Sequence, residues 1–131
     1  MVAYETGQWP GKFPGIANFP REGYNQGGEN RTGGDDMDDI IRQRIRFHGQ
    51  VQGVGFRYRA RYAAAAEGAT GWVRNDVGGT VSMEIQGTQA QIDRVIRMIE
   101  RGTYVRVEFM EVKTIPVEPD ERGFTTMSSR W

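Results

Sequence analysis

The chain has 131 residues, a length that favours one domain with at most an appendage. It contains no cysteine and one histidine, which excludes disulfides, thiolate metal sites, a cysteine nucleophile and a histidine-rich metal site. The formal net charge is zero, but residues 1–39 carry three basic against seven acidic residues, and residues 40–131 carry 14 against 10. The second segment therefore has a net charge of +4, which suits a small anionic ligand and gives only weak support for nucleic acid.

The sequence gives no indication of export or of membrane insertion. No apolar run approaches the roughly 18 residues of a membrane span. The start, "MVAYETGQWP", lacks the basic and then apolar pattern of a signal peptide. We therefore expect a soluble, cytoplasmic protein.

Residues 1–39 are predicted to be a disordered tail that precedes a domain of residues 40–131. The tail holds 8 of the 18 glycines and 3 of the 5 prolines, shows no helical or strand periodicity, and ends in the acidic stretch "DDMDD". Such a segment buries too little apolar surface to offset its ordering entropy. Aromatic residues are unusual in such tails and leave open that this one docks on the domain: Trp9, Phe13, Phe19 and Tyr24.

The domain opens with a strand, a glycine-rich loop and a helix. Apolar Ile41, Ile45 and Phe47 alternate with basic residues, which predicts a strand with one buried and one solvated face. The loop "GQVQGVG" follows. A helix is then predicted over Phe56–Glu67, because it contains "YAAAAE" and alanine is the best helix former. Gly68 is placed as its C-terminal glycine.

The second half repeats this alternation of strand and helix. "TGWVRN" at 70–75 predicts a strand, residues 76–79 a turn, and 81–87 the next strand. Thr88 and Gln91 form a capping box ahead of a helix that Gly102 closes. Further strands are predicted over 105–115 and about 124–129. The order predicts an α+β, ferredoxin-like split βαββαβ sandwich, with two helices on one face of an antiparallel sheet and a possible extra strand at the end.

The glycine-rich loop favours an anion site. It joins a strand to a helix N-terminus, where unpaired N–H groups carry partial positive charge. Glycines let the backbone turn those N–H groups inward, and Arg57 in the first helical turn offers a bidentate match to phosphate oxygens. The Walker and dinucleotide motifs do not fit, because no Gly-Lys-Ser/Thr is present and Tyr58 stands where a third glycine is needed. A tight connection beside a surface arginine is the alternative.

Two motifs together resemble the acylphosphatase family. They are "GQVQGVGFRYRARYAA" and "GATGWVRNDVGGTVSMEIQG", and the resemblance runs from about Ile40 to the end. It implies a phosphate site whose residues are Gly49, Gln50, Val51, Gln52, Gly53, Val54, Gly55, Phe56 and Arg57.

The resemblance also implies the reaction. Such enzymes hydrolyse carboxyl–phosphate mixed anhydrides to carboxylate and inorganic phosphate, without metal, cofactor or phosphoenzyme, and the residue matching Asn75 positions the attacking water. This chemistry needs positioning and charge stabilisation more than a reactive side chain. Arg57 and Asn75 are thus the expected catalytic residues of a monomeric enzyme that acts on a small molecule and binds neither nucleic acid nor membrane.

The chain departs mildly from the family. Many relatives have an acidic residue where this chain has Gly78, and another at the position of Ser82. These departures bear on the stability of the turn after Asn75, which Asp76 is expected to help hold. A catalytically weak phosphate-binding relative and an RNA-binding ferredoxin-like module are the alternative functions, the latter disfavoured because no aromatic strand motif is present.

Several other polar residues are interpreted as structural. His48 should face away from the core at the end of its strand, and Arg74 should point to the sheet face opposite Asn75. The arginine row of the first strand is interpreted as a solvated face that Glu84 and Glu108 could balance. Its members are Arg42, Arg44 and Arg46.

Overall fold

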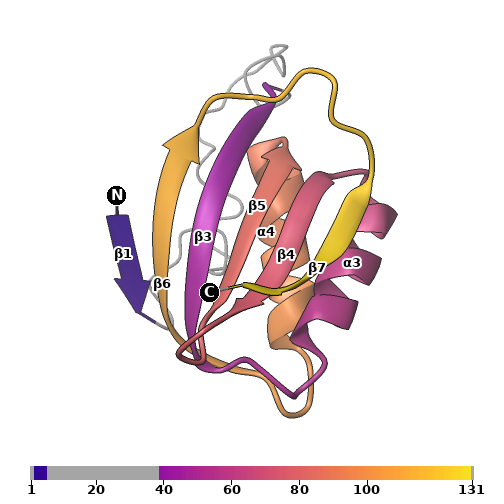
Figure 1. Cartoon of the computed structure of the whole chain (residues 1–131). Helices are drawn as coiled ribbons and strands as arrows, with labels where there is room; N and C mark the ends of the chain where they lie inside the picture. The colour runs from indigo at the N-terminus through magenta and orange to yellow at the C-terminus, as the bar shows by residue number, and fades with distance from the viewer. Residues whose placement is uncertain (1, 6–38, 131) are drawn as a thin grey trace.

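The structure, a computed structural model, describes residues 2–5 and 39–130 (Figure 1). These residues form one sheet of six strands with two helices. In chain order the elements are β1 (Val2–Glu5), β3 (Ile41–Gln50), α3 (Phe56–Glu67), β4 (Thr70–Asp76), β5 (Val81–Gly87), α4 (Gln89–Glu100), β6 (Arg106–Ile115) and β7 (Phe124–Arg130).

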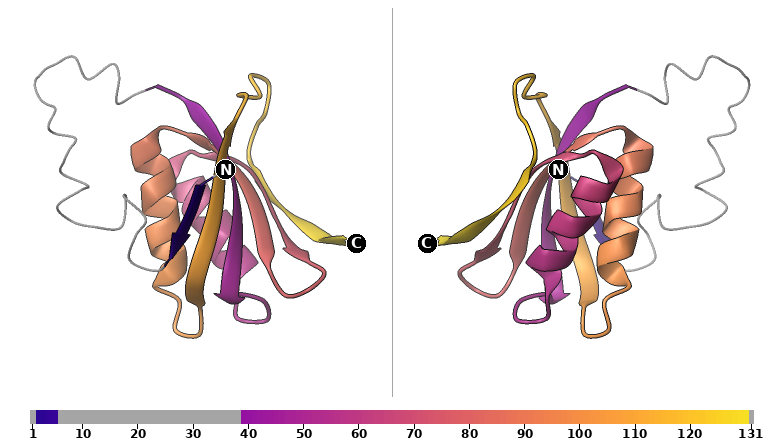
Figure 2. Two further views of the ribbon diagram at one scale, coloured as in Figure 1. Left: turned by 90° about the vertical axis from the view of Figure 1, so that its left-hand side faces the viewer. Right: turned by 90° about the vertical axis from the view of Figure 1, so that its right-hand side faces the viewer.

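The strand order β1-β6-β3-β5-β4-β7 confirms the ferredoxin-like arrangement. Its βαββαβ unit is β3, α3, β4, β5, α4 and β6, and both helices cover the same face of the sheet (Figures 1 and 2). β7 is the extra strand that the sequence left open. Because it pairs parallel to β4, the sheet is antiparallel at every pairing except that one.

The edge strand β1 lies in the segment that the sequence predicted to be a tail. Val2–Glu5 pair antiparallel with β6, in a register that sets Val2 opposite Val112 and Glu5 opposite Phe109. Tyr4 packs against the core. Four residues are too few to show a periodicity, so this strand could not be recognised without its partner. Trp9, Phe13, Phe19 and Tyr24 lie outside the described residues.

The hydrophobic core fills the space between the sheet and the helices. On α3 the buried residues are Phe56 and three alanines, whose small side chains let the helix approach the sheet closely. On α4 they are the isoleucine and valine stripe predicted from helical spacing: Ile92, Val95, Ile96 and Ile99. This packing fixes the N-terminus of α3 against the end of the sheet. No helix in the described part of the chain is long and apolar enough to cross a membrane.

The open face of the sheet corrects one expectation. Arg44 and Arg46 are exposed, but Arg42 retains only 2% of its accessible surface. Its guanidinium donates to Glu84 Oε1 (2.9 Å) and Glu121 Oε1 (2.6 Å), because the β6–β7 connection folds over it. The prediction of a solvated row was therefore wrong for Arg42. The sequence pattern missed this contact because Glu121 lies far from Arg42 along the chain. The expected balance by Glu84 is confirmed.

Candidate active site

Three connections meet at one end of the sheet. Figure 2 shows the β3–α3 loop lying between the α4–β6 connection and the β4–β5 hairpin. The loop follows β3, the central strand that pairs with both β5 and β6. Buried residues flank the loop on both sides, Phe47 on β3 and Phe56 at the start of α3, so its two ends are fixed by the core.

The loop backbone depends on glycines. Gly53 has φ of 73° and Gly55 has φ of 84°, in the left-handed region where other residues are strained. Gly49 has φ of 130°, and a Cβ there would collide with the backbone oxygen of Arg106. Val51 and Phe56, each 1% exposed, anchor the loop in the core. The loop therefore offers a ligand its backbone N–H groups and few side chains.

Gly55 is the N-cap of α3, and within the described residues no side chain caps this helix start. The first regular bond of the helix runs from Arg59 N to Gly55 O at 3.0 Å. The N–H groups of the preceding residues are those that an α-helix leaves without intrahelical partners. This helix start thus has the donors and the dipole that favour an anion.

Arg57 extends from this first turn toward the sheet edge. It is partly buried, and its Nη1 donates to the backbone oxygen of Met127 on β7 at 3.1 Å. Among the described residues it has no carboxylate partner. A neutral carbonyl fixes the guanidinium without neutralising it, so the positive charge remains available to an anion.

Gln52 joins the loop to the β4–β5 hairpin. Its Nε2 donates to the backbone oxygens of Asp76 (2.7 Å) and Thr80 (2.8 Å). Asn75 is the residue before Asp76 and pairs with Val81. It lies on the same face as buried Val73 and Val81, the face that the helices cover. The fold thus brings Asn75 to the end of the sheet where the loop lies.

Asp76 points to the opposite face. Its carboxylate accepts hydrogen bonds from Ser82 Oγ (2.6 Å), Thr80 Oγ1 (2.9 Å) and Arg74 Nε (3.1 Å). Burial alone would raise the pKa of Asp76, but these three donors and the charge of Arg74 outweigh it and hold that pKa below its usual value. The carboxylate is therefore ionised and fully engaged within the turn.

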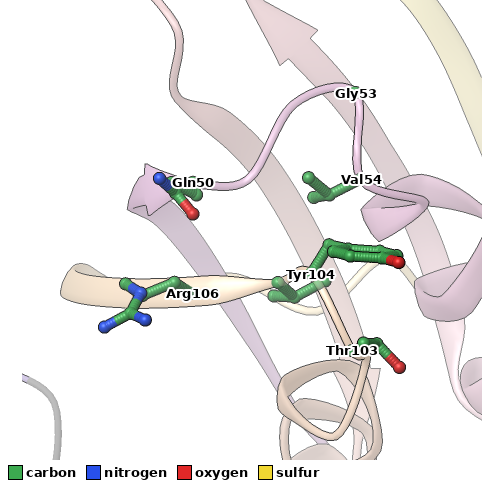
Figure 3. A pocket seen from close by; sticks show the side chains of 7 residues that line it. Gln50, Gly53, Val54, Thr103, Tyr104 and Arg106 are labelled. Atoms are coloured by element: carbon green, nitrogen blue, oxygen red, sulfur yellow. The ribbon is translucent and has the colours of Figure 1, made fainter.

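A surface hollow of about 550 Å³ lies on the other side of the loop. The loop contributes Gln50, Gly53 and Val54, and the α4–β6 connection contributes residues 103–106. Figure 3 shows Gln50 and Arg106 at one end of this hollow and Val54 and Tyr104 at the other. The loop is therefore clamped by Gln52 on its hairpin side and open on its α4–β6 side.

The structure describes every residue of the expected site. The loop residues and Arg57 lie together at the start of α3, while Gln52 and the Met127 carbonyl hold them to β4 and β7. No sequence pattern indicates these two long-range contacts, because each joins segments distant along the chain. No group of three or more metal-ligating side chains occurs among the described residues.

Two of the residues interpreted as structural behave as predicted. Arg74 lies opposite the face of Asn75, with its guanidinium 5.1 Å from the Trp72 ring and bonded to Asp76. His48 faces away from the core, and its Nε2 lies 3.5 Å from Glu111 Oε1 beside the ring of Phe109. Neither side chain belongs to the face that carries Asn75.

The fold and this end of the sheet define a class, namely small α+β proteins of ferredoxin-like topology with a glycine-rich loop at a helix N-terminus. Residues 43–126 match the acylphosphatase family, and the chain belongs to that family. This membership gives the chain its general function, that of an acylphosphatase enzyme.

Individual relatives agree with this assignment. The chain is 42% identical over 80 residues to an acylphosphatase of Geobacillus thermodenitrificans (strain NG80-2), covering 60% of this chain and 85% of that one. It is 48% identical over 82 residues to one of Rhizobium etli (strain ATCC 51251 / DSM 11541 / JCM 21823 / NBRC 15573 / CFN 42), covering 62% and 87%. The crystal structure of acylphosphatase from Bacillus subtilis superposes with a TM-score of 0.61 at 26% identity, covering 66% of this chain and 98% of that one.

Proposed function

We propose that this enzyme hydrolyses small carboxyl–phosphate mixed anhydrides to carboxylate and inorganic phosphate without a metal ion. The observation that carries the proposal is the state of Arg57. It lies beside an uncapped helix start, is held by a neutral carbonyl, and has no carboxylate partner among the described residues. A partly buried cation that no described carboxylate neutralises, next to the N–H groups of a helix start that no described side chain caps, favours a doubly charged anion.

In this proposal the loop Gly49–Phe56 and Arg57 hold the phosphoryl group. The backbone N–H groups of the loop and of the first turn of α3 donate to its oxygens. The guanidinium of Arg57 adds two further donors, and its bond to Met127 fixes its direction in advance. These groups stabilise the charge that the phosphoryl oxygens carry in the transition state, which is the main requirement of phosphoryl transfer.

Asn75 directs the nucleophile. Its amide oxygen accepts a hydrogen bond from the attacking water, while its NH₂ donates to a phosphoryl oxygen. The water oxygen forms a bond to phosphorus, and the bond from phosphorus to the acyl oxygen breaks. The carboxylate leaves with the electron pair, and the proton of the water passes to a phosphate oxygen. A carboxylate is a good leaving group, so no general acid is needed.

The direct test is release of inorganic phosphate from acetyl phosphate and benzoyl phosphate in the presence of excess EDTA. We expect turnover with EDTA to equal turnover without it, and inorganic phosphate to inhibit competitively. Loss of activity on chelation that added Mg²⁺ restores would contradict the metal-free mechanism. Competitive binding of phosphate without turnover of either substrate would favour the phosphate-binding alternative instead.

A further inference from the structure

The turn between β4 and β5 is organised by one carboxylate. Besides the three hydrogen bonds to its oxygens, Asp76 has Arg46 Nε at 3.9 Å from Oδ2, and its side chain is 12% exposed. It shares the sheet face of Arg74 and Ser82, which are a registered pair on that side. Asp76 therefore lies on the opposite face from Asn75 and cannot contact a ligand bound there.

The backbone of Asp76 is fixed as firmly as its side chain. Its N–H donates to Thr80 O at 2.9 Å, and its carbonyl accepts from Gln52 Nε2 at 2.7 Å. The glycine-rich loop and the hairpin are thus joined at residue 76. A movement of this residue would move Asn75, its neighbour in the chain, whereas the loop keeps a second contact through Gln52 Nε2 and Thr80 O at 2.8 Å.

The rest of the turn supplies little rigidity of its own. Gly78 and Gly79 have φ of 102° and 103°, and a Cβ at either position would meet nothing within 4 Å. The ladder between β4 and β7 shifts register between Arg74 and Asp76 and resumes with Asp76 opposite Arg130, so the pairing on that side is irregular at Asn75. The end of β4 is held by its pairing with β5, by the pairing of Asp76 with Arg130 on β7, and by the hydrogen bonds of Asp76.

We infer that Asp76 is a positioning residue, which sets the orientation of Asn75 through the backbone they share. The inference rests on the proposed role of Asn75 in directing water. Water attack is sensitive to small displacements, and an error of 1 Å can cost about 100-fold in rate. Phosphate binding depends on the loop and Arg57, whose contacts with the Asp76 backbone and with Met127 do not involve the Asp76 carboxylate.

The inference predicts a separation of kinetic constants. In Asp76→Ala, kcat for acetyl phosphate should fall about tenfold or more, while KM and the inhibition constant of phosphate stay within about twofold. Asp76→Asn keeps the size of the side chain and one acceptor oxygen, so it should recover part of kcat. Asp120→Ala is the control, because Asp120 is an exposed carboxylate of the β6–β7 connection.

A double-mutant cycle with Asn75→Ala distinguishes positioning from general damage. If Asp76 acts through Asn75, Asp76→Ala should cause no further loss of kcat in an Asn75→Ala background. The inference would be overturned if Asp76→Ala lowered kcat by the same factor in the wild type and in Asn75→Ala, or if Asp76→Ala alone kept the full kcat. All variants are compared by circular dichroism first. If Asp76→Ala does not fold, Ser82→Ala, which removes only the 2.6 Å bond, takes its place in the cycle.

The same cycle separates this inference from the proposed function. Full activity of Asn75→Ala would refute the role of Asn75 itself, and the inference would fall with it. A large loss of kcat in Asn75→Ala together with wild-type kcat in Asp76→Ala would leave the proposed function intact and refute the inference alone.

Discussion

Two arginines of this chain illustrate how residues of one type acquire different roles. Arg42 is buried against Glu84 and Glu121, so its charge is balanced inside the protein and serves to hold the β6–β7 connection. Arg57 is only partly buried, and its described partner is the carbonyl of Met127. Burying a charge beside a neutral acceptor is costly unless a counter-ion arrives. That difference is the physical reason to assign the anion to Arg57.

At the same scale, the carboxylate of Asp76 should make the unfolding free energy fall as the pH becomes acidic. Its pKa is lowered in the folded state, so the unfolded chain binds the proton more readily and acid favours unfolding. The stabilisation is fully present above the unfolded pKa of about 4 and is lost as pH falls through the folded pKa. In urea unfolding, the difference in unfolding free energy between wild type and Asp76→Asn should become smaller below about pH 4. A difference that does not change with pH would refute this account.

The assignment of the site residues stays a prediction, and the signals behind it are local in the sequence. Glycines followed by an arginine at a helix start form one contiguous motif, and "WVRN" adds the asparagine. The groups that hold them could not be predicted. Gln52 bonds to residues 24 and 28 positions away, and Arg57 to one 70 away, so these contacts exist only once the sheet is assembled.

At the scale of elements, both helices lie where the sequence predicted them. α3 spans the predicted Phe56–Glu67, and α4 follows a capping box formed by Thr88 and Gln91. Gly102 directly follows the C-cap of α4, and its N–H donates to Ile99 O at 3.1 Å. Arg101 is the C-cap of α4, and a Cβ on Gly102 would lie 2.8 Å from Arg59 Cδ. Gly102 therefore also packs closely against the Arg59 and Val105 side chains, a contact that the sequence pattern does not reveal.

Gly71 and Gly78 both have a positive φ, but only at Gly71 would a side chain collide with a neighbouring strand. Substituting each one therefore separates the cost of the collision from the cost of backbone strain. Gly71 of β4 has φ of 140°, and a Cβ there would collide with the backbone carbonyl of Glu84. Gly78 has φ of 102° with open space around it. In urea unfolding, Gly71→Ala should lower the unfolding free energy by about 3 kcal/mol or more, and Gly78→Ala by about 1–2 kcal/mol. Equal losses would mean that the collision contributes nothing.

For the whole molecule, the edges of the sheet are the part that sequence patterns described least well. β7 was left open as a possible strand, and β1 was placed in the tail. Edge strands are short and their pairing partners are distant in the chain, so local periodicity carries little information about them. The central strands β3 and β5 pair within the sheet, and their alternating apolar residues were sufficient to predict them from the sequence.

Removal of residues 1–39 should therefore affect stability and leave catalysis unchanged. β1 pairs with β6 at one edge of the sheet, while Arg57 and Asn75 contact or belong to β7 and β4 at the other. We expect a lower Tm, by roughly 4–8 °C per kcal/mol lost, with kcat and KM unchanged. In the full chain, Tyr4→Ala should reproduce part of that shift. An unchanged Tm would mean that β1 contributes no stability, and loss of activity would place the segment near the reaction.

The central claim is that Arg57 binds the phosphoryl group and stabilises its charge during a metal-free hydrolysis. The measurement that tests it most directly is phosphate release from acetyl phosphate in EDTA by wild type, Arg57→Ala and Arg61→Ala, the last being an exposed arginine one turn further along α3. We predict that kcat/KM falls about 100-fold or more in Arg57→Ala and stays at the wild-type value in Arg61→Ala. Wild-type kcat/KM in Arg57→Ala would contradict the account.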